Sequence, residues 1–155
     1  MITVALFEPE IPPNTGNIAR LCAANRIVLH IVGVTGFRLD DRAVRRAGLD
    51  YWPEVTLVRH ADLAELYSDL PSARFVYLST KGQQSYLEFK FHSDDCIVFG
   101  SETRGLPTEL LRENPDHTLR IPMLNPRVRS LNLATAAGIV LYEALRQTGA
   151  FKYRT

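Results

Sequence analysis

The sequence has few cysteines, few lysines and no long apolar segment. No hydrophobic run approaches the roughly 20 residues that a membrane-spanning helix needs, and residues 1–7 are typical of a strand rather than of a signal peptide. The two cysteines, Cys22 and Cys96, lie in apolar surroundings, which indicates buried thiols in a reducing compartment rather than a disulfide. We therefore expect a cytoplasmic protein that makes no membrane contact.

The motifs of several enzyme classes are also missing. The chain contains no G-x-G-x-x-G fingerprint, no P-loop and no G-x-S-x-G elbow. Its four histidines are scattered, and none stands at metal-ligand spacing from a cysteine or from another histidine, so we expect no metal site; they are His30, His60, His92 and His117. We expect the substrate to supply its own nucleophile.

The arrangement of apolar segments predicts one α/β domain over residues 1–155. Hydrophobic residues make up 46% of the chain, enough for a proper core, and short apolar runs alternate with helical patterns. Strands are expected at 2–7, 27–33, 55–59, 74–79, 95–99 and 118–121. Helices are expected at about 15–25, 40–48, 61–69, 107–113 and 130–148. The segment 84–90 is ambiguous. This alternation indicates a mainly parallel sheet flanked by helices.

Basic charge is carried almost entirely by arginine. Fifteen of the eighteen basic residues are Arg, which forms bidentate contacts with phosphate and stacks on bases, although genomic base composition explains the bias as well. The net charge of +1 excludes a basic nucleic-acid coat protein. Arg42, Arg45 and Arg46 have the spacing to share one helix face.

Three segments with unusual residues follow expected strands, where α/β sheets bind ligands. In residues 8–20, Asn14 or Thr15 can cap the next helix, Gly16 allows close approach, and Arg20 follows one turn later. An ordinary helix start explains this segment equally well. Residues 99–107 combine Gly100 and Gly105 with a carboxylate at position 102. Residues 121–134 form a proline- and arginine-rich loop, in which we expect Ser130 to cap the last helix.

The expected last helix indicates that two copies of the chain associate. Residues 130–148 are apolar nearly all round, as expected for a helix that is covered on several sides. Small residues at 134, 136, 137 and 138 allow another helix to approach closely. We therefore expect a homodimer, with a helix buried wholly in its own domain as the alternative.

Together the three segments resemble the motifs of the SPOUT superfamily of RNA methyltransferases. The resembling stretches are Asn14–Arg20, Phe99–Pro107, and Ile121–Met123 with Ser130–Ala134. The resemblance runs over essentially the whole chain and implies a SPOUT-type α/β sheet with a C-terminal trefoil knot. It also implies S-adenosylmethionine (SAM) as cofactor, which is converted to S-adenosylhomocysteine, and no metal.

The resemblance implies roles for individual residues. Arg20, Glu102 and Asn132 match catalytic positions. The positions expected to surround SAM are Leu78, Gly100, Ile121, Met123, Ser130 and Leu131. Guanidinium is effectively never deprotonated, so we expect Arg20 to hold a phosphate and stabilise the developing alkoxide rather than to act as a base. We expect Glu102 to orient Arg20 or a loop.

Residues 8–14 and 45–51 are similar to one branch of the superfamily, small enzymes that methylate the ribose 2'-oxygen of the wobble nucleotide, position 34, in leucine tRNAs. Another anticodon-loop position, such as 32, and a non-catalytic RNA-binding module remain alternatives. We expect tRNA contacts from Arg42, Arg45, Arg46, Lys81, Arg129 and Tyr142. Tyr142 could instead belong to the core.

Overall fold

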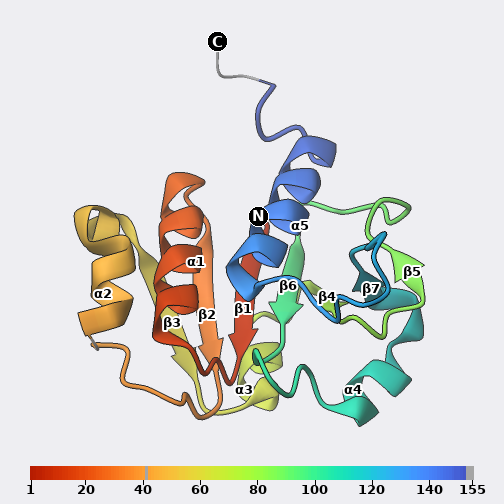
Figure 1. Ribbon diagram of the computed structural model, residues 1–155. Helices are drawn as coiled ribbons and strands as arrows, with labels where there is room; N and C mark the ends of the chain where they lie inside the picture. The colour runs from red at the N-terminus through yellow and green to blue at the C-terminus, as the bar shows by residue number, and fades with distance from the viewer. Residues whose placement is uncertain (41, 153–155) are drawn as a thin grey trace.

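A computed structural model describes residues 1–40 and 42–152, which form a twisted parallel sheet (Figure 1). The strands are β1 (Thr3–Phe7), β2 (Val28–Val32), β3 (Thr56–His60), β4 (Arg74–Leu78), β5 (Gln84–Ser85), β6 (Asp95–Phe99) and β7 (Thr118–Arg120). The sheet has seven strands in the order β3-β2-β1-β6-β4-β7-β5, and its neighbouring strands pair in parallel. The predicted α/β class is therefore confirmed.

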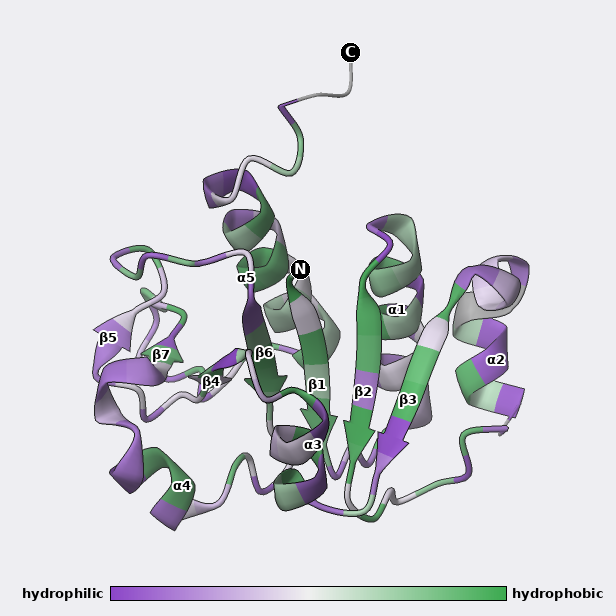
Figure 2. Ribbon diagram, turned by 180° about the vertical axis from the view of Figure 1, so that it is seen from behind, coloured by the Kyte–Doolittle hydropathy of each residue, from purple (hydrophilic) through white to green (hydrophobic). Residues whose placement is uncertain are grey.

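Helices cover both faces of the sheet. They are α1 (Pro12–Ala24), α2 (Arg42–Gly48), α3 (Leu63–Asp69), α4 (Thr108–Glu113) and α5 (Leu133–Gln147), with short 3-10 helices η1 (Leu49–Glu54) and η2 (Pro115–His117). Figures 1 and 2, seen from opposite sides, place α1, α2 and α5 over one face and α3 over the other. Within the described part of the chain, no helix is long and apolar enough to span a membrane.

The alternating faces of the central strands fill two hydrophobic cores. Val4 and Leu6 of β1 pack with α1 and α5 in the larger core, whereas Ala5 between them belongs to the smaller core beside α3. Figure 2 shows the hydrophobic character of β1, β2 and β6, which are covered on both sides. Cys22 and Cys96 are buried and unbonded, as predicted, and burial raises the pKa of the Cys22 thiol to about 12.

The predicted elements agree with the structure except at their boundaries. All six predicted strands are present, and the seventh, β5, falls in the ambiguous segment 84–90. Asp41, in the predicted helix 40–48, lies outside the described residues. As predicted, another part of the chain packs closely against Gly16. That part is α2, since a Cβ on Gly16 would lie 2.4 Å from the Val44 carbonyl oxygen.

Both predicted helix caps are wrong. Helix α1 begins at Pro12, so Asn14 and Thr15 lie inside it; proline suits a first position because no hydrogen bond is needed from its nitrogen there. Ser130 does not cap α5. Asn132 does so instead, and its side-chain oxygen accepts a hydrogen bond from the Thr135 amide at 3.1 Å.

Candidate active site

A cavity of about 580 Å³ lies beyond the carboxyl ends of β4 and β6, beside the loop that follows β7. Three segments form most of its wall, residues 78–81, 99–106 and 121–133 in part, and the start of α1 completes it. Its position is the one at which parallel α/β sheets bind ligands, and its size lies in the range of small-molecule sites.

The loop after β6 forms one wall of the cavity and is folded tightly on itself. The Ser101 amide donates to the Gly105 carbonyl at 3.3 Å, and the Gly105 amide donates back to the Ser101 carbonyl at 3.0 Å. A Cβ on Gly100 would lie 2.2 Å from the carbonyl carbon of Gly105, so only glycine fits there. Gly105 has a positive φ of 66°, which glycine adopts without strain.

Glu102 connects this loop to the start of α1. Its carboxylate accepts hydrogen bonds from the amides of Glu10 and Ile11 at 2.7 and 3.1 Å and from the Asn14 side chain at 3.3 Å. The hydrogen bonds from the two backbone amides hold the Glu102 side chain and the segment before α1 in fixed positions. Of the two predicted roles for Glu102, orienting a loop therefore agrees with the contacts, whereas Arg20 is not among its hydrogen-bond partners.

Asn14 extends the connection to the third segment. Its side-chain oxygen accepts a hydrogen bond from the Asn132 side chain at 3.0 Å, while its amide nitrogen donates to Glu102. Asn14 is buried and lines the cavity. The sequence pattern identified it only as a helix cap. The one signal in the sequence was that asparagine carries both a donor and an acceptor and can therefore connect two other side chains.

A second set of contacts joins the same two loops nearer the surface. The Thr103 hydroxyl donates to a Glu10 carboxylate oxygen at 2.7 Å, and Arg104 pairs with Glu8 at 3.3 Å. Hydrogen bonds from the side chains of Thr103 and then Ser101 hold the pKa of Glu10 below its usual value. The wall of the cavity is thus held by contacts of Thr103 and Arg104 in addition to those of Glu102.

The cavity brings together most of the predicted site residues. All six positions expected to surround SAM line it, and so do two of the expected catalytic residues and two expected tRNA contacts: Leu78, Gly100, Ile121, Met123, Ser130, Leu131, Glu102, Asn132, Lys81 and Arg129. Residues from three separate segments of the chain therefore share one space.

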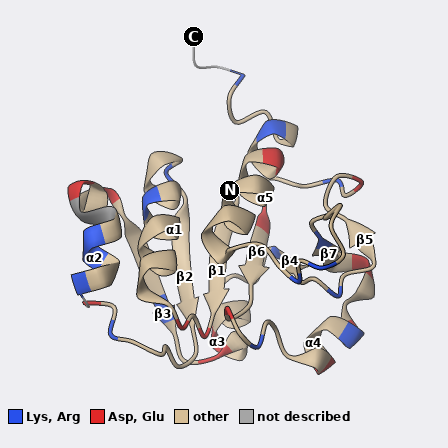
Figure 3. Ribbon diagram, viewed as in Figure 1, with Lys and Arg blue, Asp and Glu red and all other residues tan. Residues whose placement is uncertain are grey.

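The other predicted residues lie apart from this cavity. Arg20 is exposed on α1 and is not among the cavity-lining residues; its guanidinium carbon lies 4.6 Å from the centre of the Tyr51 ring. Arg42, Arg45 and Arg46 are exposed on α2, which Figure 3 shows at one side of the molecule. Together with Arg20 they form what we call the arginine face. Tyr142 is 47% exposed on α5, outside the core.

The fold and the cavity define an α/β protein with a cavity of small-molecule size at the carboxyl edge of a parallel sheet. Residues 1–142 match the SpoU rRNA methylase family, and the chain belongs to that family. This match confirms the resemblance to SPOUT methyltransferases.

Several relatives agree with this assignment. The tRNA (cytidine(34)-2'-O)-methyltransferase of Saccharophagus degradans is 49% identical over 150 residues, 96% of this chain and 97% of the relative. A solved structure on the 2-OH methylation of C/U34 on tRNA is 47% identical, with a TM-score of 0.89 over 95% of each chain. The AdoMet-bound rRNA methyltransferase from Sinorhizobium meliloti is 29% identical, with a TM-score of 0.82 over 94% of this chain and 56% of that one.

Proposed function

We propose that the protein transfers a methyl group from SAM to the ribose 2'-oxygen of the wobble nucleotide, position 34, of leucine tRNAs. The observation that carries this proposal is the cavity, because it gathers every residue that the motifs associate with SAM. The relatives that share nearly half of the sequence over almost the whole chain act, by their names, on cytidine 34 of tRNA.

The residues of the cavity fit SAM. Leu78, Ile121 and Leu131 offer apolar walls for an adenine ring, and the tightly folded backbone around Gly100 offers fixed polar groups for its edge. Bound there, SAM supplies a methyl carbon attached to a sulfonium leaving group. The protein then has to place the 2'-oxygen and stabilise it as its proton leaves.

The side chains of the cavity position groups rather than accept a proton. Glu102 is occupied by two backbone amides and by Asn14, so it holds the cavity wall, and Asn132 both caps α5 and contacts Asn14. No histidine is among the residues that line the cavity. Arg20 therefore has the role of holding a phosphate and stabilising the alkoxide, with phosphate or water taking the proton.

A homodimer is part of this proposal, because Arg20 of one chain lies outside that chain's own cavity. One side of α5 is buried in the core, including Val140 and Leu141, whereas Ala134 and Ile139 are only partly covered. Leu124 and Val128, in the loop before α5, are exposed. A second chain that packs on this surface would cover these apolar residues and could bring its own arginines to the cavity.

The C-terminal trefoil knot is also part of the proposal. It is supported by the close contact of the segment after β4 with β7. The Ser79 amide donates to the Leu119 carbonyl at 2.9 Å, and the Tyr86 amide donates to the Arg120 carbonyl at 3.0 Å. A Cβ on Gly82 would lie 2.5 Å from the carbonyl carbon of Leu119. The segment thus wraps closely on the strand that leads into the third cavity loop.

The tRNA is held by basic residues at two places. Lys81 and Arg129 lie at the cavity, where they can bind phosphates next to the methylated nucleotide, and the arginine face offers phosphate contacts further away. Tyr142 is exposed on α5, with the Asn25 side chain donating to its hydroxyl at 3.5 Å. A monomer of net charge +1 binds tRNA through such local patches rather than through bulk charge.

Transfer of labelled methyl from SAM to unmodified leucine tRNA tests the proposal, with the product mapped by nuclease digestion. We expect a 2'-O-methyl group at nucleotide 34. Label at position 32 or elsewhere in the anticodon loop would contradict the assigned position. SAM binding without label in any tRNA of a total pool would support a non-catalytic RNA-binding module instead.

A further inference from the structure

Two histidines that are far apart in the sequence lie in contact on β2 and β3, two strands that contribute no residue to the cavity. The Nδ1 atom of His30, on β2, lies 2.9 Å from Nε2 of His60, at the end of β3, and both rings are buried. Because they are thirty residues apart, the sequence alone did not indicate that they are in contact. Parallel pairing of β2 with β3 brings them together.

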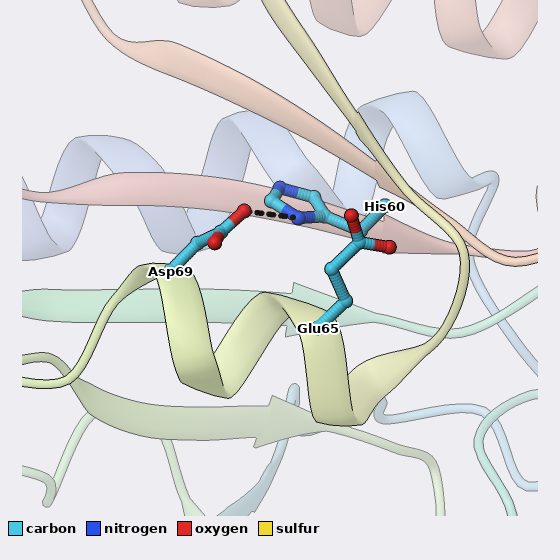
Figure 4. A group of neighbouring side chains, drawn as sticks. All are labelled: His60, Glu65 and Asp69. Carbon is cyan, nitrogen blue, oxygen red and sulfur yellow. Dashed lines mark ion pairs between the residues drawn. The ribbon is translucent and has the colours of Figure 1, made fainter.

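The other ring nitrogen of His60 faces two carboxylates of α3. Its Nδ1 atom lies 3.2 Å from an Asp69 oxygen, without the geometry of a hydrogen bond, and has no hydrogen-bond partner among the described residues. One ligand atom each from His60, Glu65 and Asp69 lies within 4.8 Å of the others. Figure 4 shows both acidic side chains reaching from α3 toward the histidine ring.

The start of α3 sets the position of these carboxylates. Asp62 caps the helix and accepts a hydrogen bond from the Glu65 amide at 2.8 Å, and the Glu65 carboxylate accepts one from the Ala61 amide. Glu65 and Asp69 are four residues apart and therefore share one face of the helix. The Asp69 side chain is 54% exposed and that of His60 is fully buried, so the cluster has one side open to solvent.

We propose that His60, Glu65 and Asp69 bind a divalent transition-metal ion of the zinc class, with water completing its coordination. One imidazole nitrogen and two carboxylate oxygens are a ligand set that zinc accepts, whereas magnesium and calcium favour oxygen ligands alone. The three ligand atoms already lie within 4.8 Å of one another, and the exposed side chains of Glu65 and Asp69 have room to adjust around an ion. The ion would bind the buried Nδ1 atom of His60, which lies beside Asp69 but has no hydrogen-bond partner among the described residues.

His30 completes the site from behind. With Nδ1 of His60 on the ion, the proton of His60 sits on Nε2 and is donated to Nδ1 of His30, which fixes the orientation of the ligand ring. The ion joins β3, the outer strand of the sheet, to α3. It lies apart from the residues that line the cavity, so the inference does not rest on the proposed methyl transfer.

Titration of the untagged protein with zinc chloride, in competition with a chromophoric chelator, tests the site. We expect one zinc ion per chain. Asp69→Asn and Glu65→Gln should each weaken zinc binding at least about tenfold, since each removes a charged ligand oxygen. Glutamine still offers the Ala61 amide an acceptor, so the helix start is retained. Glu88→Gln, the same change at an exposed carboxylate elsewhere, should leave zinc affinity unchanged.

Thermal unfolding provides a second measurement. Saturating zinc should raise the melting temperature of the wild-type protein and of Glu88→Gln, and should raise that of Asp69→Asn much less. Zinc binding of equal affinity in all four proteins would place the ion elsewhere and overturn the proposal. So would the absence of stoichiometric binding to the wild type. Neither result would bear on methyl transfer, which is assayed without added zinc.

Discussion

The cavity and the arginine face differ in how many contacts within a single chain hold their side chains in place. Around the cavity, Glu102, Asn14 and Asn132 connect three loops through hydrogen bonds that span about ninety residues or more of sequence. On the arginine face, Arg20 stacks on Tyr51. A single chain thus connects the loops of the proposed cofactor site, whereas the proposed RNA contacts on the arginine face are exposed side chains left for the tRNA or a second chain to meet.

This difference predicts two kinds of variant. Changes at the cavity should weaken SAM binding and methyl transfer together. Changes on the arginine face should weaken methyl transfer or tRNA binding and leave SAM binding intact. Each variant below is therefore assayed both for SAM affinity by calorimetry and for methyl transfer. A variant of the arginine face that weakened SAM binding as much as methyl transfer would contradict the distinction.

The largest effect is expected from Arg20→Ala. Loss of a charged group that stabilises the developing alkoxide should lower kcat about 100- to 1,000-fold, the range seen when one such donor is removed. SAM affinity should stay within about twofold of the wild type, since Arg20 is not among the cavity-lining residues. Steady-state methyl transfer with saturating tRNA and SAM measures kcat separately from binding.

Arg20→Lys separates the guanidinium from its charge. Lysine keeps the positive charge but loses the planar, bidentate fork, so we expect most of the loss seen with alanine. Near-normal turnover of Arg20→Lys would contradict a specific guanidinium role.

Gly100→Ala should have the next largest effect. The added Cβ would lie 2.2 Å from the carbonyl carbon of Gly105, so the cavity wall has to move. Overpacking of this kind costs about 1–3 kcal/mol, and we expect SAM binding to weaken up to about 100-fold, with methyl transfer falling in parallel.

Ser72→Ala is the control for this change. Ser72 is exposed in the turn before β4 and is not among the cavity-lining residues, so the SAM affinity of this variant should equal that of the wild type. Thermal unfolding of both variants distinguishes a local change at the cavity from loss of the fold. Normal SAM affinity of Gly100→Ala would mean that the wall does not hold the cofactor.

The cavity was largely predictable because its signals are local. Gly100, Gly105 and the prolines mark tight loops after apolar strands, and a ligand site at the ends of parallel strands follows from the fold class alone. The caps of α1 and α5 were not predictable in the same way. Ser130 and Asn132 are both good capping residues, and only the path of the preceding loop decides between them.

Contacts between distant residues could not be predicted from one sequence. Asn14 gains its role from Glu102, 88 residues away, and from Asn132, 118 residues away. His30 and His60 meet because of the β2–β3 pairing. In each case the residue type is ordinary at its own position, and the tertiary fold supplies its partner.

Glu102→Gln should have a moderate effect. It replaces one carboxylate oxygen by an amide donor that faces backbone N–H groups, and the loss of a hydrogen bond to a charged group costs about 1.5 kcal/mol, or roughly tenfold in SAM affinity. Asn14→Ala should act through the same network, so the double variant should lose less than the two single losses added together.

Glu109→Gln provides the control, since it changes an exposed carboxylate on α4 that pairs only at the surface with Arg112. It should leave SAM affinity unchanged. Fully additive losses for Glu102 and Asn14 would show that the hydrogen bond between them does not couple the two loops.

The smallest effect is expected from the double variant Arg45→Ala/Arg46→Ala. These exposed arginines of α2 are expected to neutralise phosphates far from the methylated nucleotide, so their loss should weaken tRNA binding several-fold without changing kcat or SAM affinity. Log affinity falls as log salt concentration rises, and each lost phosphate contact reduces the magnitude of this slope by about 0.7–0.9. The double variant should therefore reduce the magnitude of the slope by about 1.5, whereas Arg112→Ala on α4 should leave it unchanged. An unchanged slope in the double variant would show that Arg45 and Arg46 do not contact tRNA phosphates, and would shift the expected phosphate contacts toward the cavity rim, where Lys81 and Arg129 lie.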